Sequence, residues 1–217
     1  MIKNVIFDFD GIIADTNKLK INILTNILSK YFKYPKKNIK NLLVKSSPGL
    51  NRLAYIEMLQ KITSRKIDKK NILKSINKEM LDSLLQSKIN PYLRKMREYN
   101  TKINWYIITS GNEKEVTFFL KKKKIDNCFK DVVGGRGDKY LSFLNLSKKY
   151  KINRKNLVVI GDGNRDLKLI KKLSCYGILV LKWSLEKNYL KYLKVSKVEI
   201  LNNFRSLNTL YKKIIKT

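Results

Sequence analysis

Four short apolar runs, most of them ending in glycine or polar residues, mark the strands that the sequence predicts. They cover residues 3–8, 103–109, 156–161 and 176–181, each of a length typical of a buried strand. Helical patterns lie at 112–124, 138–150 and 164–173, and an amphipathic pattern from Phe204 to Ile215 closes the chain. Strands that alternate with helices predict an α/β fold, with a Rossmann-like parallel sheet and right-handed crossovers.

The stretch between the first two runs has a different pattern. From about residue 16 to 90, apolar residues recur at helical spacing and no strand pattern is convincing. The recurring positions are Ile21, Leu24, Ile27, Leu28 and Tyr31, then Tyr55, Met58, Leu59 and Ile62, then Ile72, Ile76, Met80, Leu81 and Leu84. Turn signals at 47–49 and 90–91 punctuate it. We therefore predict an all-helical domain at residues 16–91, inserted into a core made of residues 1–15 and 92–217.

Polar residues gather where the predicted strands end. These positions are Asp8 and Asp10, Thr109 and Ser110, and Asp162 and Asp166. Ligands of open parallel sheets bind at the carboxyl ends of the strands, which all meet at one edge. The pattern therefore predicts a single site at that edge.

The acidic pairs favour a divalent cation. Gly11 permits a sharp turn after Asp8 and Asp10, so the two carboxylates can converge, and converging carboxylates repel unless a cation or proton lies between them. Asp162 and Asp166 are four residues apart and can share one side of a first helical turn. Oxygen ligands without His or Cys suit Mg²⁺. Taken alone, each pair could instead cap a helix.

A hydroxyl at the end of the second predicted strand could help to hold an anion at the same edge. Thr109-Ser110-Gly111 stands at a strand-to-helix turn, where a hydroxyl and backbone N–H groups together make an anion site. Taken alone, a simple helix cap explains this turn better. Lys139 opens the next predicted helix, although one lysine in so basic a chain carries little weight by itself.

The composition excludes several catalytic mechanisms and metal sites. The chain has no histidine, which excludes Ser–His and Cys–His mechanisms and any His-ligated metal. Its two cysteines, Cys128 and Cys175, form no CxxC pair, which argues against a disulfide scaffold or a zinc site and favours a reducing compartment. We see no signal peptide and no apolar run long enough to cross a bilayer, so we expect a cytoplasmic protein that does not contact a membrane.

The charge is unusual, with 48 Lys plus Arg against 17 Asp plus Glu and a formal net charge of +31. Such a surface attracts anions, among them phosphorylated metabolites and nucleic acid, but codon bias towards Lys would also produce it. The lysines are spread along the chain and no nucleic-acid recognition motif accompanies them. We therefore expect nucleic acid to bind only non-specifically, through electrostatics.

Together and in this order, the motifs resemble those of the haloacid dehalogenase-like superfamily, in its phosphatase and phosphomutase branch. The family's Asp-x-Asp-Gly-x-x-x-Asp-Thr motif is matched from Asp8 to Thr16, its hydroxyl motif at Ser110 (or Thr109), its lysine motif at Lys139, and its Gly-Asp-Gly-x-x-Asp motif at Asp162 and Asp166. The resemblance covers nearly the whole chain.

This resemblance implies a role for each matched residue. Asp8 would be the nucleophile that forms an aspartyl-phosphate, and Asp10 the acid and then the base. Mg²⁺ would be held by Asp8, the backbone carbonyl of Asp10 and Asp162. Asp166 would support the metal or orient Lys139. Ser110 and Lys139 would grip the transferring phosphoryl group. True dehalogenases of the superfamily lack a carboxylate at the position of Asp10, so the resemblance implies phosphoryl transfer.

The helical insert stands where the family places its cap. Pro48-Gly49-Leu50-Asn51-Arg52 resembles a Gly-x-Ser-Arg helix start found in caps of the β-phosphoglucomutase and phosphoglycolate phosphatase type, although Asn51 replaces the usual Ser. Arg52 would then contact a second anionic group of the substrate. An ordinary exposed helix arginine is the alternative.

Three functions are compatible with these residues. The first is a phosphatase for small phosphorylated metabolites, such as sugar phosphates, phosphoglycolate or nucleotides. The second is a phosphomutase, which would use the same residues and differ in how fast water reaches the aspartyl-phosphate. The third is a basic nucleic-acid-binding protein, or a phosphatase for nucleic-acid ends, on the same scaffold. The oligomeric state is not predicted.

Overall fold

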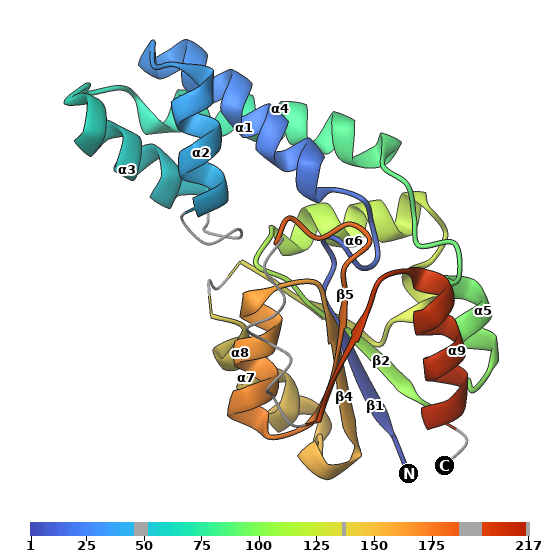
Figure 1. The fold of residues 1–217 in the computed structure, drawn as a ribbon. Coiled ribbons are helices and arrows are strands. Elements are labelled where there is room, and N and C mark those ends of the chain that lie inside the picture. Colours follow the sequence, from blue (N-terminus) through green and yellow to red (C-terminus); the bar gives the residue numbers. More distant parts are fainter. Residues whose placement is uncertain (46–51, 136–137, 187–196, 216–217) are drawn as a thin grey trace. The chain divides into compact units, whose positions relative to one another are not determined.

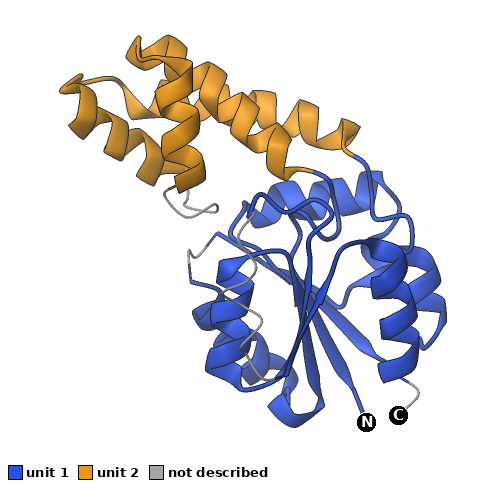
Figure 2. Ribbon diagram, viewed as in Figure 1, with its two compact units in different colours: residues 1–15, 88–217 blue, residues 16–87 orange. Residues whose placement is uncertain are grey.

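The computed structural model describes residues 1–45, 52–135, 138–186 and 197–215 (Figure 1). The chain forms two compact units (Figure 2). Unit 1 contains Met1–Asp15 and Lys88–Thr217, and unit 2 contains Thr16–Ser87. The sequence placed the second boundary at residue 91, whereas unit 1 resumes at Lys88. The two units are described separately below.

Unit 1 is built on a six-stranded parallel sheet in the order β3-β2-β1-β4-β5-β6. The strands are β1 (Asn4–Phe7), β2 (Asn104–Ile108), β3 (Asp131–Val133), β4 (Leu157–Gly161), β5 (Tyr176–Val180) and β6 (Val198–Leu201). Every neighbouring pair is parallel. The α/β fold with a parallel sheet, predicted from alternating strands and helices, is confirmed.

Helices cover both faces of the sheet (Figure 1). They are α5 (Leu93–Glu98), α6 (Glu113–Lys122), α7 (Lys139–Tyr150), α8 (Asn164–Leu173) and α9 (Phe204–Ile214). On the face of α7 and α8, a core cluster joins Ile6 and Tyr106 to Phe143 and Leu167. On the other face Trp105 packs edge-on against Tyr211 of α9 and donates a 2.7 Å hydrogen bond to its hydroxyl.

The two strands that the sequence did not predict, β3 and β6, lie at the two edges of the sheet. β3 has only three residues, all half-buried, and β6 contains the exposed Glu199. Edge strands bury less surface, so neither produces a clear apolar run. The central strands β1 and β4 are buried throughout, which made them visible in the sequence.

Unit 2 is all-helical in its described residues, as the sequence predicted. It contains α1 (Asn17–Phe32), α2 (Lys36–Lys45), α3 (Arg52–Thr63) and α4 (Lys69–Gln86). The buried positions of α4 are Ile72, Ile76, Met80 and Leu84, which follow one another at helical spacing. Ile62, which the pattern assigned to a buried face, is 47% exposed. No described helix has the length and apolar character needed to cross a membrane.

Candidate active site

The turn after β1 presents Asp8 at the carboxyl edge of the sheet. The backbone N–H of Asp8 donates to the carbonyl of Ile160 in the neighbouring β4, at 2.8 Å. Gly11 takes a φ of 79°, in the left-handed region that favours glycine, and its N–H donates to Ala14 at 2.9 Å. The buried Asn90 then donates to the backbone of the same turn, through its side chain to Ile12. These hydrogen bonds fix the backbone of the turn and so the position of Asp8.

Lys139 joins Asp8 to Asp166. Its Nζ atom lies 2.8 Å from Oδ2 of Asp8 and 2.6 Å from Oδ1 of Asp166. Lys139 is only 7% exposed, and it begins α7 because the side chain of Asp138 accepts from the N–H of Tyr140. Burial by itself would lower the pKa of Lys139, but the charges of Asp166 and Asp8 outweigh burial and raise it. The two carboxylates therefore favour the charged ammonium form of Lys139.

Asp166 braces the turn that ends β4. Its Oδ2 atom accepts from the backbone N–H groups of Asp162 (3.2 Å) and Gly163 (3.3 Å), while Oδ1 holds Lys139. A Cβ atom on Gly161 would lie 2.0 Å from Cγ of Asp166, so only glycine lets this carboxylate pack so closely. Both oxygens of Asp166 are occupied by protein donors. This geometry favours the role of orienting Lys139 over that of a direct metal ligand.

The acidic cluster fits a hard divalent cation. One carboxylate oxygen each from Asp8, Asp162 and Asp166 can be chosen so that all lie within 4.8 Å of one another. Burial, followed by the charges of Asp166 and Asp10, raises the pKa of Asp8 from 3.8 to about 7, against the lowering effect of Lys139. A bound Mg²⁺ would favour ionised Asp8 and offset the repulsion among these acids. The donor set contains oxygen only, which Mg²⁺ prefers.

Asp10 stands beside this cluster rather than in it. Its backbone forms a bridge with Ala14 across the turn, and Asp10 is half-buried. Its charge contributes to the raised pKa of Asp8, so the two carboxylates are electrostatic neighbours. This position suits a group that exchanges protons next to a nucleophile.

Thr109 and Ser110 have different surroundings, which the sequence could not distinguish. Thr109 is buried, and its hydroxyl accepts from the N–H of Gly111 at 3.0 Å. Ser110 is half-buried, and its hydroxyl accepts from Nη1 of Arg165 at 2.7 Å. Thr109 therefore stabilises the turn, whereas Ser110 lies at the more accessible position beside a cation.

Three residues that the sequence analysis did not select also belong to this region. Arg165, at the start of α8, brings a guanidinium to Ser110. Ser184 donates to the carbonyl of Asp162 at 2.6 Å, and Glu186 accepts from the N–H of Asn164 at 3.0 Å. Arg165 could have been noticed inside the Gly-Asp-Gly motif. Ser184 and Glu186 carry no local signal, because only the fold brings their loop to the end of β4.

The remaining predicted residue, Arg52, belongs to unit 2. It is the first residue of α3, is half-buried, and its Nη1 donates to Oδ1 of Asn77 on α4. The rest of the segment that resembled a family motif, residues 48–51, lies outside the described residues, as do residues 136–137 before Lys139. The predicted contact of Arg52 with substrate stays a prediction.

Fold and site together define an α/β protein with an acidic, lysine-bridged cluster at the carboxyl edge of a parallel sheet. The chain belongs to the haloacid dehalogenase-like hydrolase family, whose model matches residues 5–180. The resemblance noted from the motifs is confirmed. A search of the curated proteins gave no match.

Solved structures show the same fold over almost the entire chain. A Thermotoga maritima protein provisionally named a β-phosphoglucomutase has 19% identity and a TM-score of 0.74, over 98% of this chain and 100% of that one. A predicted phosphoglycolate phosphatase from Haemophilus somnus 129pt has 16% identity and a TM-score of 0.74, over 96% and 97%. A predicted phosphatase from Clostridium acetobutylicum has 16% identity and a TM-score of 0.72, over 100% of both chains. At such identities the likeness shows the fold.

Proposed function

We propose that this protein is a Mg²⁺-dependent phosphatase that transfers a phosphoryl group from a small phosphorylated metabolite to Asp8 and then to water. One observation carries the proposal. A buried carboxylate, Asp8, is paired with a buried ammonium, Lys139, inside a cluster of further acids. A carboxylate can attack an anionic phosphate only where positive charge offsets the repulsion between them, and Lys139 with Mg²⁺ would provide it.

The residues divide the reaction into two steps. In the first, an oxygen of Asp8 forms a bond to phosphorus while the ester bond breaks, and Asp10 donates a proton to the leaving alkoxide. In the second, Asp10 accepts a proton from water, which attacks phosphorus and releases inorganic phosphate and free Asp8. Ser110 and Lys139 would hold the phosphoryl oxygens throughout. Mg²⁺, held by Asp8, Asp162 and the carbonyl of Asp10, would neutralise phosphate charge when bound.

Phosphate release from a panel of phosphorylated metabolites, with Mg²⁺ and with EDTA, tests this proposal. We expect turnover by the wild type only with Mg²⁺, and none by Asp8→Asn. Asp162→Asn should raise the Mg²⁺ concentration for half-maximal activity at least about 10-fold, because losing even a group that only supports a metal ligand costs about that much in affinity. The matched control is Asp82→Asn on an exposed face of α4. Turnover that survives in EDTA, or in Asp8→Asn, would contradict the mechanism.

A phosphomutase is the second candidate, favoured by the named similarity to a β-phosphoglucomutase. It would use the same Asp8, so the lifetime of the phosphorylated enzyme separates the two. Phospho-Asp8 that outlives a turnover and transfers its phosphoryl group to a sugar phosphate would identify a mutase. Rapid transfer of the phosphoryl group from Asp8 to water would identify the phosphatase.

The third candidate is a basic protein that binds nucleic acid or acts on its ends. It would be supported only if nucleic acid stayed bound at physiological salt.

Arg52 is proposed as a contact for a second anionic group of the substrate. Its guanidinium also donates to Asn77, so a purely structural role is the competing explanation. Arg52→Ala should lower kcat/KM more than about threefold for a dianionic substrate, because an ion pair to the substrate is lost. Asn77→Ala removes the same internal hydrogen bond and serves as the control. If both variants lowered the stability equally and left kcat/KM unchanged, the proposed contact of Arg52 with substrate would be wrong.

A further inference from the structure

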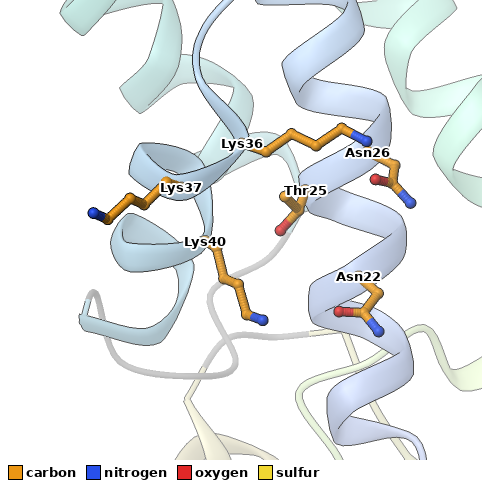
Figure 3. A pocket seen from close by; sticks show the side chains of 6 residues that line it. All are labelled: Asn22, Thr25, Asn26, Lys36, Lys37 and Lys40. Atoms are coloured by element: carbon orange, nitrogen blue, oxygen red, sulfur yellow. The ribbon is translucent and has the colours of Figure 1, made fainter.

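A polar cavity lies within unit 2, between α1 and α2 (Figure 3). It has a volume of about 310 Å³. Its lining residues are Asn22, Thr25, Asn26, Lys36, Lys37 and Lys40. The first three come from α1 and the three lysines from the start of α2. The cavity thus offers three ammonium groups and no acid.

The three lysines are not neutralised by neighbouring acids. Neither α1 nor α2 contains Asp or Glu. Among the described residues, Lys36, Lys37 and Lys40 take part in no ion pair or side-chain hydrogen bond. Lys36 and Lys37 also occupy the first turn of α2, where the helix dipole disfavours positive charge. An anion in the cavity would offset the repulsion among the lysines and the unfavourable interaction of Lys36 and Lys37 with the helix dipole.

A buried hydroxyl supplies an independent sign of a ligand. Thr25 is 5% exposed, and its Oγ1 atom is buried without a hydrogen-bond partner among the described residues. In Figure 3 this hydroxyl points into the space between the two helices. Buried polar groups in native proteins are nearly always paired, so an unpaired one needs an explanation. A ligand oxygen in the cavity would accept a hydrogen bond from this hydroxyl.

The side chains around Thr25 are arranged as donors. Figure 3 shows Lys36 reaching across the cavity towards Asn26, and Lys40 extending to the side of Asn22, while Lys37 points away. Two ammonium groups, a hydroxyl and two amide groups can together serve a ligand with several acceptor oxygens and a negative charge. A phosphate group meets this description, since it accepts several charge-assisted hydrogen bonds at once.

We propose that the cavity between α1 and α2 binds a phosphate group, with Lys36, Lys40 and Thr25 as its principal donors. The cavity is larger than a single phosphate, so its ligand is a phosphorylated small molecule or a segment of phosphodiester backbone. The proposal does not depend on the activity assigned to Asp8. This cavity contains no metal-binding acid, so it binds phosphate in EDTA, whereas the Asp8 site is proposed to need Mg²⁺.

Titration of the full-length protein with inorganic phosphate, in EDTA and followed by amide NMR, tests the site. We expect saturable shifts for Asn22, Thr25 and Asn26. The double substitution Lys36→Gln/Lys40→Gln should raise the Kd about 100-fold, because two charge-assisted hydrogen bonds are lost and each is worth about one factor of ten. The control Lys70→Gln/Lys74→Gln removes the same charge from exposed positions of α4 and should leave the Kd within about threefold.

Thr25→Val separates a binding hydroxyl from a structural one. Valine has the shape of threonine without its hydroxyl. The variant should bind phosphate several-fold more weakly and yet, in phosphate-free buffer, melt no lower than the wild type, because it removes an unpaired buried polar group. Unchanged binding by Thr25→Val would overturn the assigned role of the hydroxyl.

Two further outcomes decide the proposal and its ligand. The proposal would be overturned if the shifts did not saturate, or if Lys70→Gln/Lys74→Gln weakened phosphate binding as much as Lys36→Gln/Lys40→Gln. Either result would mean that phosphate only screens a basic surface. Competition experiments with glycerol 3-phosphate and with a short single-stranded oligonucleotide then identify the source. Tighter binding of glycerol 3-phosphate supports a metabolite site, and tighter binding of the oligonucleotide supports a backbone site.

Discussion

The ammonium group of Lys139 lies between Asp8 and Asp166, 2.8 Å from one carboxylate and 2.6 Å from the other. The first carboxylate follows β1 and the second belongs to α8, so a single buried cation connects two distant parts of the chain. The same contact places a positive charge beside the proposed nucleophile. Asp166, which also holds the turn after β4, keeps that charge in place.

Replacing Lys139 by Gln should therefore lower kcat by about 10²- to 10³-fold, the effect usual for losing one group that stabilises transition-state charge. The protein should also melt at a lower temperature, because two buried carboxylates lose the cation between them. Phosphate release and thermal unfolding measure the two effects. The control is Lys168→Gln on the exposed side of α8, which should change neither. Activity within threefold of wild type would exclude Lys139 from the reaction.

The stability of the metal-free protein should depend on pH, because Asp8 has a raised pKa in the folded state. Burial raises the pKa of Asp8 from 3.8 to about 7, so the folded protein holds a proton that the unfolded chain releases. The stability due to this proton is present below about pH 4 and is lost as the pH rises through 7. Asp8→Asn cannot ionise and should melt several degrees higher than wild type at pH 8 in EDTA.

This difference should shrink towards pH 4 and should also shrink when Mg²⁺ is added, because the cation stabilises ionised Asp8. Thermal unfolding of both proteins between pH 4 and 8 provides the measurement. Asp82→Asn, an exposed carboxylate replaced in the same way, is the control and should show no such trend. A difference that grows towards acid pH would contradict the raised pKa of Asp8.

Ser110 and Thr109 should respond differently to loss of their hydroxyls. Ser110→Ala should lower kcat/KM by about tenfold or more with little change in stability, because its hydroxyl is proposed to bind the phosphoryl group. Thr109→Val should lower the stability by about 1 kcal/mol, because the N–H of Gly111 loses its acceptor. Kinetics and denaturant unfolding distinguish the two. The reverse result would assign phosphate binding to Thr109.

The two glycines that flank Asp162 should tolerate alanine very differently. A Cβ on Gly161 would lie 2.0 Å from Cγ of Asp166, whereas a Cβ on Gly163 would be 3.6 Å from its nearest neighbour, Oε1 of Glu186. Gly161→Ala must displace the carboxylate that holds Lys139, so we expect loss of activity together with lower stability. Gly163→Ala should remain folded and active. Circular dichroism melts and phosphate release would show this contrast.

Much of the fold was visible in the sequence because its central strands are buried on both faces. After Asn4 the residues of β1 are all apolar, as are those of β4 up to its final Gly161, and each strand is followed by acids of the candidate site. The edge strands β3 and β6 were missed, since half-buried segments of three or four residues have no distinctive pattern. The helical unit was recognised from its spacing, although Ile62 proved exposed.

The candidate site was predicted as a set of residue types but not as a set of contacts. Asp8, Asp162 and Asp166 were chosen from motifs at strand ends, and Lys139 was chosen from the start of a predicted helix. The pairing of Lys139 with two carboxylates, and the contact of Ser110 with Arg165, depend on distances between segments far apart in the chain. Ser184 and Glu186 could not be selected at all, because their loop reaches the end of β4 only in the folded protein.

By itself, then, the sequence determined the parallel sheet, the helical insert and the acids at the strand ends. These follow from local periodicity and from residue types, which neighbouring residues specify. Tertiary structure alone decided which charge lies beside Asp8, and whether the hydroxyl of Thr25 in the lysine-lined cavity has a partner. Electrostatic and hydrogen-bond energies fall steeply with distance and change with burial, and both are set only when separate segments pack together.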